Sequence, residues 1–105
     1  MSEHAARTFA ALGDPTRLAL LRRLSGTPRL NVTELTEGTG VSRQAVSKHL
    51  AVLQDAGLVS RVSRGRETLY GLRHDGLDVA EGFLERLARG WDEAVERLRA
   101  HVEEG

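Results

Sequence analysis

The chain has 105 residues, with 15 basic and 15 acidic side chains and no cysteine. This length suffices for one modest core, so we predict a single domain over residues 1–105. The lack of cysteine excludes a disulfide framework, a thiolate metal site and a cysteine nucleophile. Neither a membrane-length apolar run nor a signal-peptide pattern occurs, so we expect a cytoplasmic protein without a membrane partner.

The zero net charge conceals an uneven distribution. Residues 1–75 carry eleven basic and seven acidic side chains, whereas residues 76–105 carry four and eight. The first part is therefore basic by four charges and the second is acidic by four. Phosphates attract the first and repel the second, so we expect any contact with nucleic acid to lie before residue 76.

Two helices are predicted at the start of the chain. The first covers residues 3–12, places Ala5, Phe9 and Leu12 on one face, and ends at Gly13. The second begins at Pro15 with Asp14 as its N-cap, because proline at the first helical position loses no hydrogen bond. Its buried stripe is predicted to consist of Leu18, Leu21 and Leu24.

Residues 31–57 predict a helix-turn-helix. Asn31 and Glu34 have the spacing of a capping box at the start of a short helix. The turn is Gly38-Thr39-Gly40, and we expect Val41 to fill the corner between the helices. The second helix starts after the N-cap Ser42 and runs to Ala56, where Gly57 can adopt the left-handed conformation that ends a helix.

The second of these helices has two unlike faces. Val46, Leu50 and Leu53 recur at helical spacing and predict its buried stripe. Gln44, Ser47, Lys48 and Ala51 fall on the opposite side, Arg43 lies between the two faces, and the helix contains no acid before Asp55. Short polar groups, an amide and cations are the groups that contact base edges and phosphates in a major groove. His49, at the edge of the buried stripe, either bonds a phosphate or braces the helix.

A hairpin is predicted over residues 58–72. Residues 58–63 and 67–72 alternate in polarity, and Arg64-Gly65-Arg66 forms the turn between them. A basic hairpin beside a helix-turn-helix is typical of a wing that contacts the DNA backbone or the minor groove. The alternative is an ordinary hairpin with a solvated basic tip.

A long final helix is predicted over about residues 76–103. Leu77, Leu84, Trp91 and Leu98 are spaced by seven, as are Ala80, Leu87, Ala94 and His101. This apolar seam exceeds what a small domain covers, so we predict a dimer interface. The alternative is a helix packed wholly against its own domain. Gly82 and Gly90 predict a bend or a close helix approach.

Three segments carry a resemblance to a known family. Residues 9–24, residues 41–50 and residues 53–59, above all Gly13-Asp-Pro-Thr-Arg and Val46-Ser-Lys-His-Leu, are similar to the ArsR family of winged helix-turn-helix repressors. The resemblance covers about residues 5–72. It implies a mainly α fold with a small β-hairpin, and long N- and C-terminal helices that form a homodimer. It also implies repression at an operator of dyad symmetry that an inducer relieves.

The resemblance also implies which residues act. The DNA-contacting positions would be Ser42, Arg43, Gln44, Ser47, Lys48 and His49, together with the wing residues Arg61, Arg64 and Arg66. The dimer interface would comprise Phe9, Leu77, Leu84, Leu87, Trp91 and Leu98.

Metal-sensing members of the family differ from this chain at the ligand positions. Asn31 and Thr33 occupy places where thiolates would be expected in the helix-turn-helix. In the last helix His101 and Glu104 form half of a site, but Ala88 and Gly90 cannot ligate, and tetrahedral coordination needs more ligands. We therefore expect a metal-independent regulator with no metal site and no cofactor.

Other classes of function remain as alternatives. One is a metal-responsive repressor with unrecognised ligands, and another is a winged helix used only for protein contacts, against which the cations argue. An enzyme is the weakest class, because no histidine has a suitable serine, cysteine or carboxylate pair and no glycine-rich phosphate loop occurs.

Overall fold

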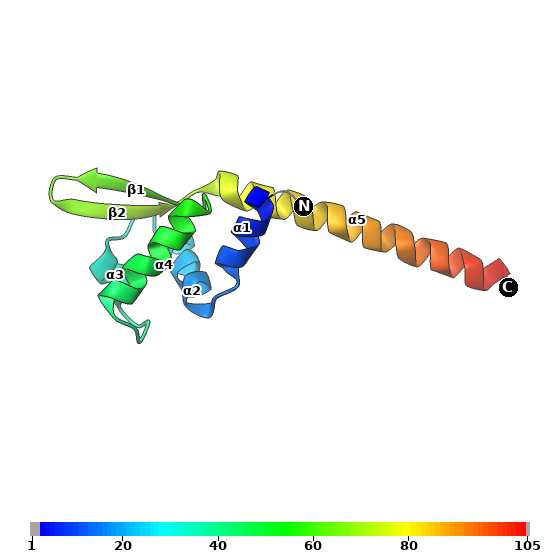
Figure 1. Ribbon diagram of the computed structural model, residues 1–105, viewed down its shortest axis with the longest axis horizontal. Helices are drawn as coiled ribbons and strands as arrows, with labels where there is room; N and C mark the ends of the chain where they lie inside the picture. The colour runs from blue at the N-terminus through cyan, green and yellow to red at the C-terminus, as the bar shows by residue number, and fades with distance from the viewer. Residues whose placement is uncertain (1–2, 105) are drawn as a thin grey trace.

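The computed structural model describes residues 3–104, which form a small helical body, a hairpin and a projecting helix (Figure 1). The fold is mainly helical with one two-stranded antiparallel sheet, as predicted. In chain order the elements are α1 (Glu3–Leu12), α2 (Pro15–Gly26), α3 (Val32–Thr36), α4 (Arg43–Asp55), β1 (Val59–Arg64), β2 (Glu67–Leu72) and α5 (His74–Glu104).

The hydrophobic core lies where α2, α3, α4 and the hairpin meet. The stripe on α4 is confirmed, since Val46, Leu50 and Leu53 are fully buried. The stripe predicted for α2 is wrong at one position, because Leu18 is 37% exposed whereas Leu20 is fully buried. Leu20, Leu21 and Leu24 centre the buried face, and a helix advances about 100° per residue, so Leu18 is rotated away from the core.

Local hydrogen bonds set the helix starts. The Asp14 carboxylate accepts from the Arg17 N–H at 3.0 Å, and Pro15 begins α2. Asn31 and Glu34 form the predicted capping box, with bonds of 2.8 and 3.0 Å. Each cap satisfies N–H groups that the first helical turn leaves without partners, so the starts of α2 and α3 are fixed locally.

The turn of the helix-turn-helix differs from the prediction in one respect. Gly38 and Gly40 both have positive φ, 78° and 74°, as a tight turn requires. Val41, expected to fill the corner, is 37% exposed instead. The hydroxyl of Thr39 closes the corner by donating to the Thr36 carbonyl at 2.8 Å and accepting from the Val41 N–H at 3.3 Å.

The hairpin is anchored to the body at its base. Its antiparallel register pairs Val59 with Leu72 and, at the tip, Arg64 with Glu67. Leu30 and Tyr70 exchange two backbone hydrogen bonds of 3.0 and 2.8 Å across an isolated bridge. The base therefore has a fixed place beside α3, while the tip projects past the body (Figure 1).

The last helix is slightly longer than predicted. It begins at His74 and continues as one helix to Glu104, past both Gly82 and Gly90. A close approach of backbone occurs at Gly76, where an added Cβ would collide with Gly57. None of the described helices combines the length and apolar character that a membrane span requires.

Only the first part of α5 packs on the rest of the chain. Phe83 meets Phe9 of α1 edge to face, with ring centroids 5.3 Å apart, and Ala80 is buried. From Leu84 to Glu103 every side chain is exposed, and this part projects beyond the body (Figure 1). The alternative of a helix packed wholly against its own domain is therefore wrong for the distal part.

Candidate nucleic-acid interface

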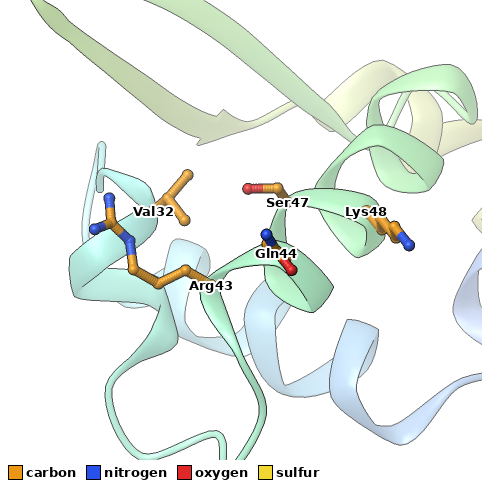
Figure 2. Close-up of a pocket in the computed structure, with 5 residues that line it drawn as sticks. All are labelled: Val32, Arg43, Gln44, Ser47 and Lys48. Carbon is orange, nitrogen blue, oxygen red and sulfur yellow. The ribbon is translucent and has the colours of Figure 1, made fainter.

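The N-terminal half of α4 presents an exposed polar face beside α3. Arg43, Gln44, Ser47 and Lys48 are exposed, and with Val32 they line an open hollow of about 740 Å³ (Figure 2). Burial of Val46 and Leu50 leaves Gln44 and Lys48 on the opposite side of α4 and Ser47 at its margin, while Arg43 extends outward from the first turn. The sequence-predicted face is therefore assembled on one rigid helix.

The side chains on this face point in different directions. Figure 2 shows Arg43 and Ser47 directed toward the side where Val32 lies, whereas Lys48 extends away from it. The guanidinium and the ammonium can donate to phosphate or guanine, and the amide of Gln44 can pair with adenine. The face thus combines a central polar region with cations on both sides.

Ser42 lies at the start of this helix and has a structural bond of its own. Its hydroxyl oxygen accepts from the Ala45 N–H at 3.1 Å, which caps α4. The hydroxyl proton takes no part in that bond and remains available to donate to a phosphate. The same residue can therefore cap the helix and contact an anion.

His49 is the least exposed of the six candidates on α4 and its N-cap. Its side chain is 24% exposed, and its Nδ1 lies 3.3 Å from a guanidinium nitrogen of Arg17 and 3.9 Å from the Asp14 carboxylate. The backbone N–H of Arg17 lowers the pKa of Asp14, and His49 and Arg17 lower it further. The imidazole is therefore held against α2 by its Nδ1 edge.

The three wing arginines are exposed. Arg61 lies on β1 opposite Tyr70, while Arg64 and Arg66 flank the tip glycine, Gly65. Within residues 3–103 none of the three forms an ion pair. Their charges are thus available to an external anion.

A second hollow joins the wing to the helix-turn-helix. It has a volume of about 400 Å³, and Arg43 of α4 and Arg66 of the wing both line it. Glu67, the one acid near the tip, accepts from the Asn31 amide at 3.1 Å. This bond joins residues 36 positions apart and holds the wing beside α3, so two cations from distant segments face the same space.

The predicted interface residues on α5 fall into two groups. The distal ones lie along one exposed stripe: Leu84 (52% exposed), Leu87 (59%), Trp91 (71%) and Leu98 (64%). Leu77 and Phe9 are half-buried within this chain, where Leu77 packs on the core and Phe9 on Phe83. The distal stripe has no partner within residues 3–103.

Potential metal ligands are dispersed over the surface. Among the side chains that the structure describes, no three His, Asp or Glu residues come together in a group that could hold a metal ion. His101 is exposed on the distal part of α5, and the side chain of Glu104 lies outside the described residues.

Sequence reasoning missed the role of Arg17. The residue lies in the Gly-Asp-Pro-Thr-Arg segment, but its side chain bonds to His49, 32 positions away, and to two carbonyls at the end of α1. Its place three residues after an N-capping aspartate was the available signal. No local pattern identifies its distant partners.

Two helices joined by a tight turn, a basic wing and an exposed acid-free helical face define a winged helix-turn-helix DNA-binding protein. A sequence profile described as a helix-turn-helix domain matches residues 12–62. The chain is 36% identical over 78 residues to the HTH-type transcriptional regulator YgaV of Escherichia coli, covering 74% of this chain and 79% of that one.

Two solved structures are similar to the whole arrangement. The first is an ArsR-like transcriptional regulator from a Rhodococcus species, with a TM-score of 0.79, 38% identity, and coverage of 91% of this chain and 90% of that one. The second is the homodimeric winged helix-turn-helix DNA-binding domain of Mb0332 from Mycobacterium bovis, with a TM-score of 0.65, 28% identity, and coverage of 90% and 84%. The chain belongs to the ArsR family of winged helix-turn-helix transcriptional regulators. It is therefore a DNA-binding regulator and not an enzyme.

Proposed function

We propose that the chain forms one domain that dimerises and represses transcription in the cytoplasm by binding an operator of dyad symmetry. An inducer then releases the repressor from the operator. The observation that carries the proposal is the pairing of an exposed DNA-compatible face on α4 with an exposed apolar stripe on α5.

The contacts with DNA divide by chemistry. Gln44 and Ser47 occupy the centre of the α4 face and are suited to base edges, whereas Arg43 and Lys48 are suited to phosphates. Ser42 and His49 lie at the margins and add donors to the phosphate backbone of the DNA. The wing contributes Arg61, Arg64 and Arg66, which carry charge toward the flanking phosphates or the minor groove.

Dimerisation follows from the exposed seam of α5. A monomeric domain seldom leaves four large apolar side chains exposed along one stripe of a helix. The distal part of α5 does so at Leu84, Leu87, Trp91 and Leu98. A second copy offers the same stripe, so a two-fold axis can bury both at once. The similar Mycobacterium bovis domain is described as homodimeric, which supports this assembly.

A two-fold dimer would bind an operator of dyad symmetry. Two copies of α4 would then read two half-sites related by the same axis and separated by about one turn of DNA, roughly 34–36 Å. The acidic distal part of α5 stays away from the phosphates because like charges repel.

The inducer is proposed not to be a metal ion at the family's usual positions. Asn31 uses its side chain to cap α3 and to hold Glu67, and Ala88 and Gly90 offer no ligand atoms. Neither set of positions therefore offers the four ligand atoms that tetrahedral zinc needs.

A gel shift tests the central claim. Purified protein is mixed with the promoter upstream of its own coding region, with and without a chelator, and with an unrelated duplex as control. We expect a specific shift that the chelator does not alter. An equal shift of both duplexes would contradict specific binding to an operator. A shift that depends on the chelator would contradict metal independence.

A further inference from the structure

One guanidinium group connects three helices at the edge of the proposed DNA-binding face. Arg17, in the first turn of α2, donates from Nε to the Ala11 carbonyl at 2.7 Å and from Nη2 to the Ala10 carbonyl at 3.3 Å. Its Nη1 lies 3.3 Å from Nδ1 of His49 on α4. The end of α1 and the middle of α4 are therefore joined through a single side chain.

The chemistry of the two groups fixes where the proton of His49 lies. A guanidinium has five N–H donors and no acceptor, so a hydrogen bond to Nδ1 requires that Nδ1 accept. In a neutral imidazole the proton then resides on Nε2, at the other edge of the ring. Across residues 3–103 no hydrogen bond engages Nε2.

The Asp14 carboxylate is the competing partner for Nδ1. It lies 3.9 Å away, beyond hydrogen-bonding distance, and its Oδ2 atom already accepts from the Arg17 N–H at 3.0 Å. A proton on Nδ1 would face the cationic guanidinium at 3.3 Å. Both distances favour Nδ1 as acceptor and Nε2 as donor.

We propose that Arg17 is a positioning residue for DNA binding, which holds His49 as the Nε2–H tautomer so that this N–H donates to a backbone phosphate. The inference rests on the proposed placement of α4 against DNA. A neutral N–H contact of this kind adds affinity without reading sequence, because phosphates are the same at every base pair. The bonds to Ala10 and Ala11 make the ring position depend on α1 as well.

Nitrogen-15 NMR of the DNA-free protein tests the tautomer directly. Two-bond correlations recorded at a mildly alkaline pH should show His49 protonated at Nε2 and not at Nδ1. Arg17→Gln should lose this preference. Arg23→Gln is the matched control, because Arg23 also bonds two carbonyls, those of Glu34 and Glu37 at 2.6 and 3.0 Å, and does not contact His49.

Binding assays test the contact with phosphate. Glutamine places an N–H near the position of Nε2, whereas asparagine reaches only the position of Nδ1. His49→Gln should therefore bind within about twofold of wild type, and His49→Asn should bind about five- to tenfold more weakly. The loss should be the same on the operator and on an unrelated duplex, and Arg17→Gln should share it while Arg23→Gln does not.

The two measurements separate the inference from the function on which it rests. An Nδ1–H tautomer in the wild-type protein would overturn the role of Arg17 even if the operator is bound tightly. Equal affinity of the Gln and Asn variants would overturn the phosphate contact. Absence of any operator binding by wild type, with the Nε2–H tautomer present, would instead contradict the proposed function. Loss of folding in Arg17→Gln leaves the wild-type tautomer and both His49 variants to decide.

Discussion

The backbone of Gly57 occupies the space that a side chain on Gly76 would need. A Cβ atom on Gly76 would lie 2.7 Å from the Gly57 carbonyl carbon, 3.2 Å from the Leu58 nitrogen, and closest of all to the Gly57 oxygen. Gly57 ends α4 with φ of 76°, and the Arg73 N–H donates to the Leu58 carbonyl at 2.8 Å. The end of the proposed recognition helix and the start of α5 therefore touch backbone to backbone.

Gly76→Ala should destabilise the protein because its new methyl group meets backbone atoms that cannot rotate away. Overpacking of this kind costs about 1–3 kcal/mol of unfolding free energy. Gly82→Ala is the control, since its Cβ would approach only the flexible end of Arg86, at 3.5 Å. Helix propensity predicts that this control gains up to about 1 kcal/mol. Chemical unfolding of both variants measures the difference, and equal stability would contradict the tight contact.

Gln44 and Lys48 should have different effects on DNA binding. Gln44→Ala should relax base preference by about 1–3 kcal/mol at one position, because an amide pairs bidentately with adenine. Lys48→Ala should weaken binding to all sequences and reduce the salt-dependence slope by about one unit. Titrations of operator and scrambled duplex at several salt concentrations distinguish the two. Unchanged affinity in both variants would remove this helix as the reader.

The wing tip should contribute to affinity but not to folding. Arg64 and Arg66 are exposed and make no ion pair within residues 3–103, so their replacement by Ala should leave the melting temperature unchanged and weaken operator binding. The double Lys variant is the control, because it keeps both charges near the phosphates. A parallel loss of melting temperature and affinity would place these arginines in a structural network.

The distal stripe of α5 should govern assembly. Leu84→Glu or Leu98→Glu should produce monomers, since an unpaired charge in an apolar interface costs several kcal/mol. Arg89→Glu, a charge change on the opposite side of the helix, is the control. Trp91, which is 71% exposed in the single chain, should be shielded in the wild-type assembly and exposed in the monomers.

Sedimentation and tryptophan fluorescence check this prediction together. The monomeric variants should also lose tight operator binding, because each half-site supplies only part of the free energy. A wild-type chain that sediments as an 11.5 kDa monomer at micromolar concentration while binding operator tightly would contradict the dimer.

Asp14 should couple stability to acid pH. The Arg17 N–H holds the pKa of this carboxyl below its ordinary value, so the ionised cap stabilises the folded chain above that ordinary value. The contribution is lost as the pH falls from the ordinary pKa through the lowered one. Asp14→Asn keeps a capping oxygen but cannot titrate, so it should flatten this part of the pH–stability curve. Urea unfolding at a series of acid pH values measures it, and a curve identical to wild type would contradict the role of the cap.

Features that depend on neighbouring residues could be predicted from sequence. The caps at Asp14, Asn31 and Ser42 and the end of α4 at Gly57 each require only a few adjacent residues, and all four occur as expected. The buried stripe of α4 followed from helical periodicity alone. The face that lines the hollow was then fixed as the opposite side of that stripe.

Features that depend on distant residues could not be predicted. The phase of α2 is set by packing on its neighbours, so Leu20 and not Leu18 faces the core. The contact of Arg17 with His49 and that of Asn31 with Glu67 join positions 32 and 36 residues apart. The importance of Gly76 likewise arises only when α5 is placed against Gly57, whereas the low helix propensity of Gly82 and Gly90 can be recognised from sequence alone.

The contact between Gly57 and Gly76 makes α5 a lever with its pivot beside α4. The helix extends about 42 Å beyond Gly76 at 1.5 Å per residue, so a rotation of about 5° at the pivot moves its far end by roughly 4 Å. The displacement decreases in proportion to the distance from the pivot, so a movement of about 4 Å at the far end corresponds to well under 1 Å in the first turn of α5. With no side chain between the two glycines, such a shift at the base of α5 would press directly on the backbone at the end of α4, and it would also disturb the packing of Phe83 on Phe9.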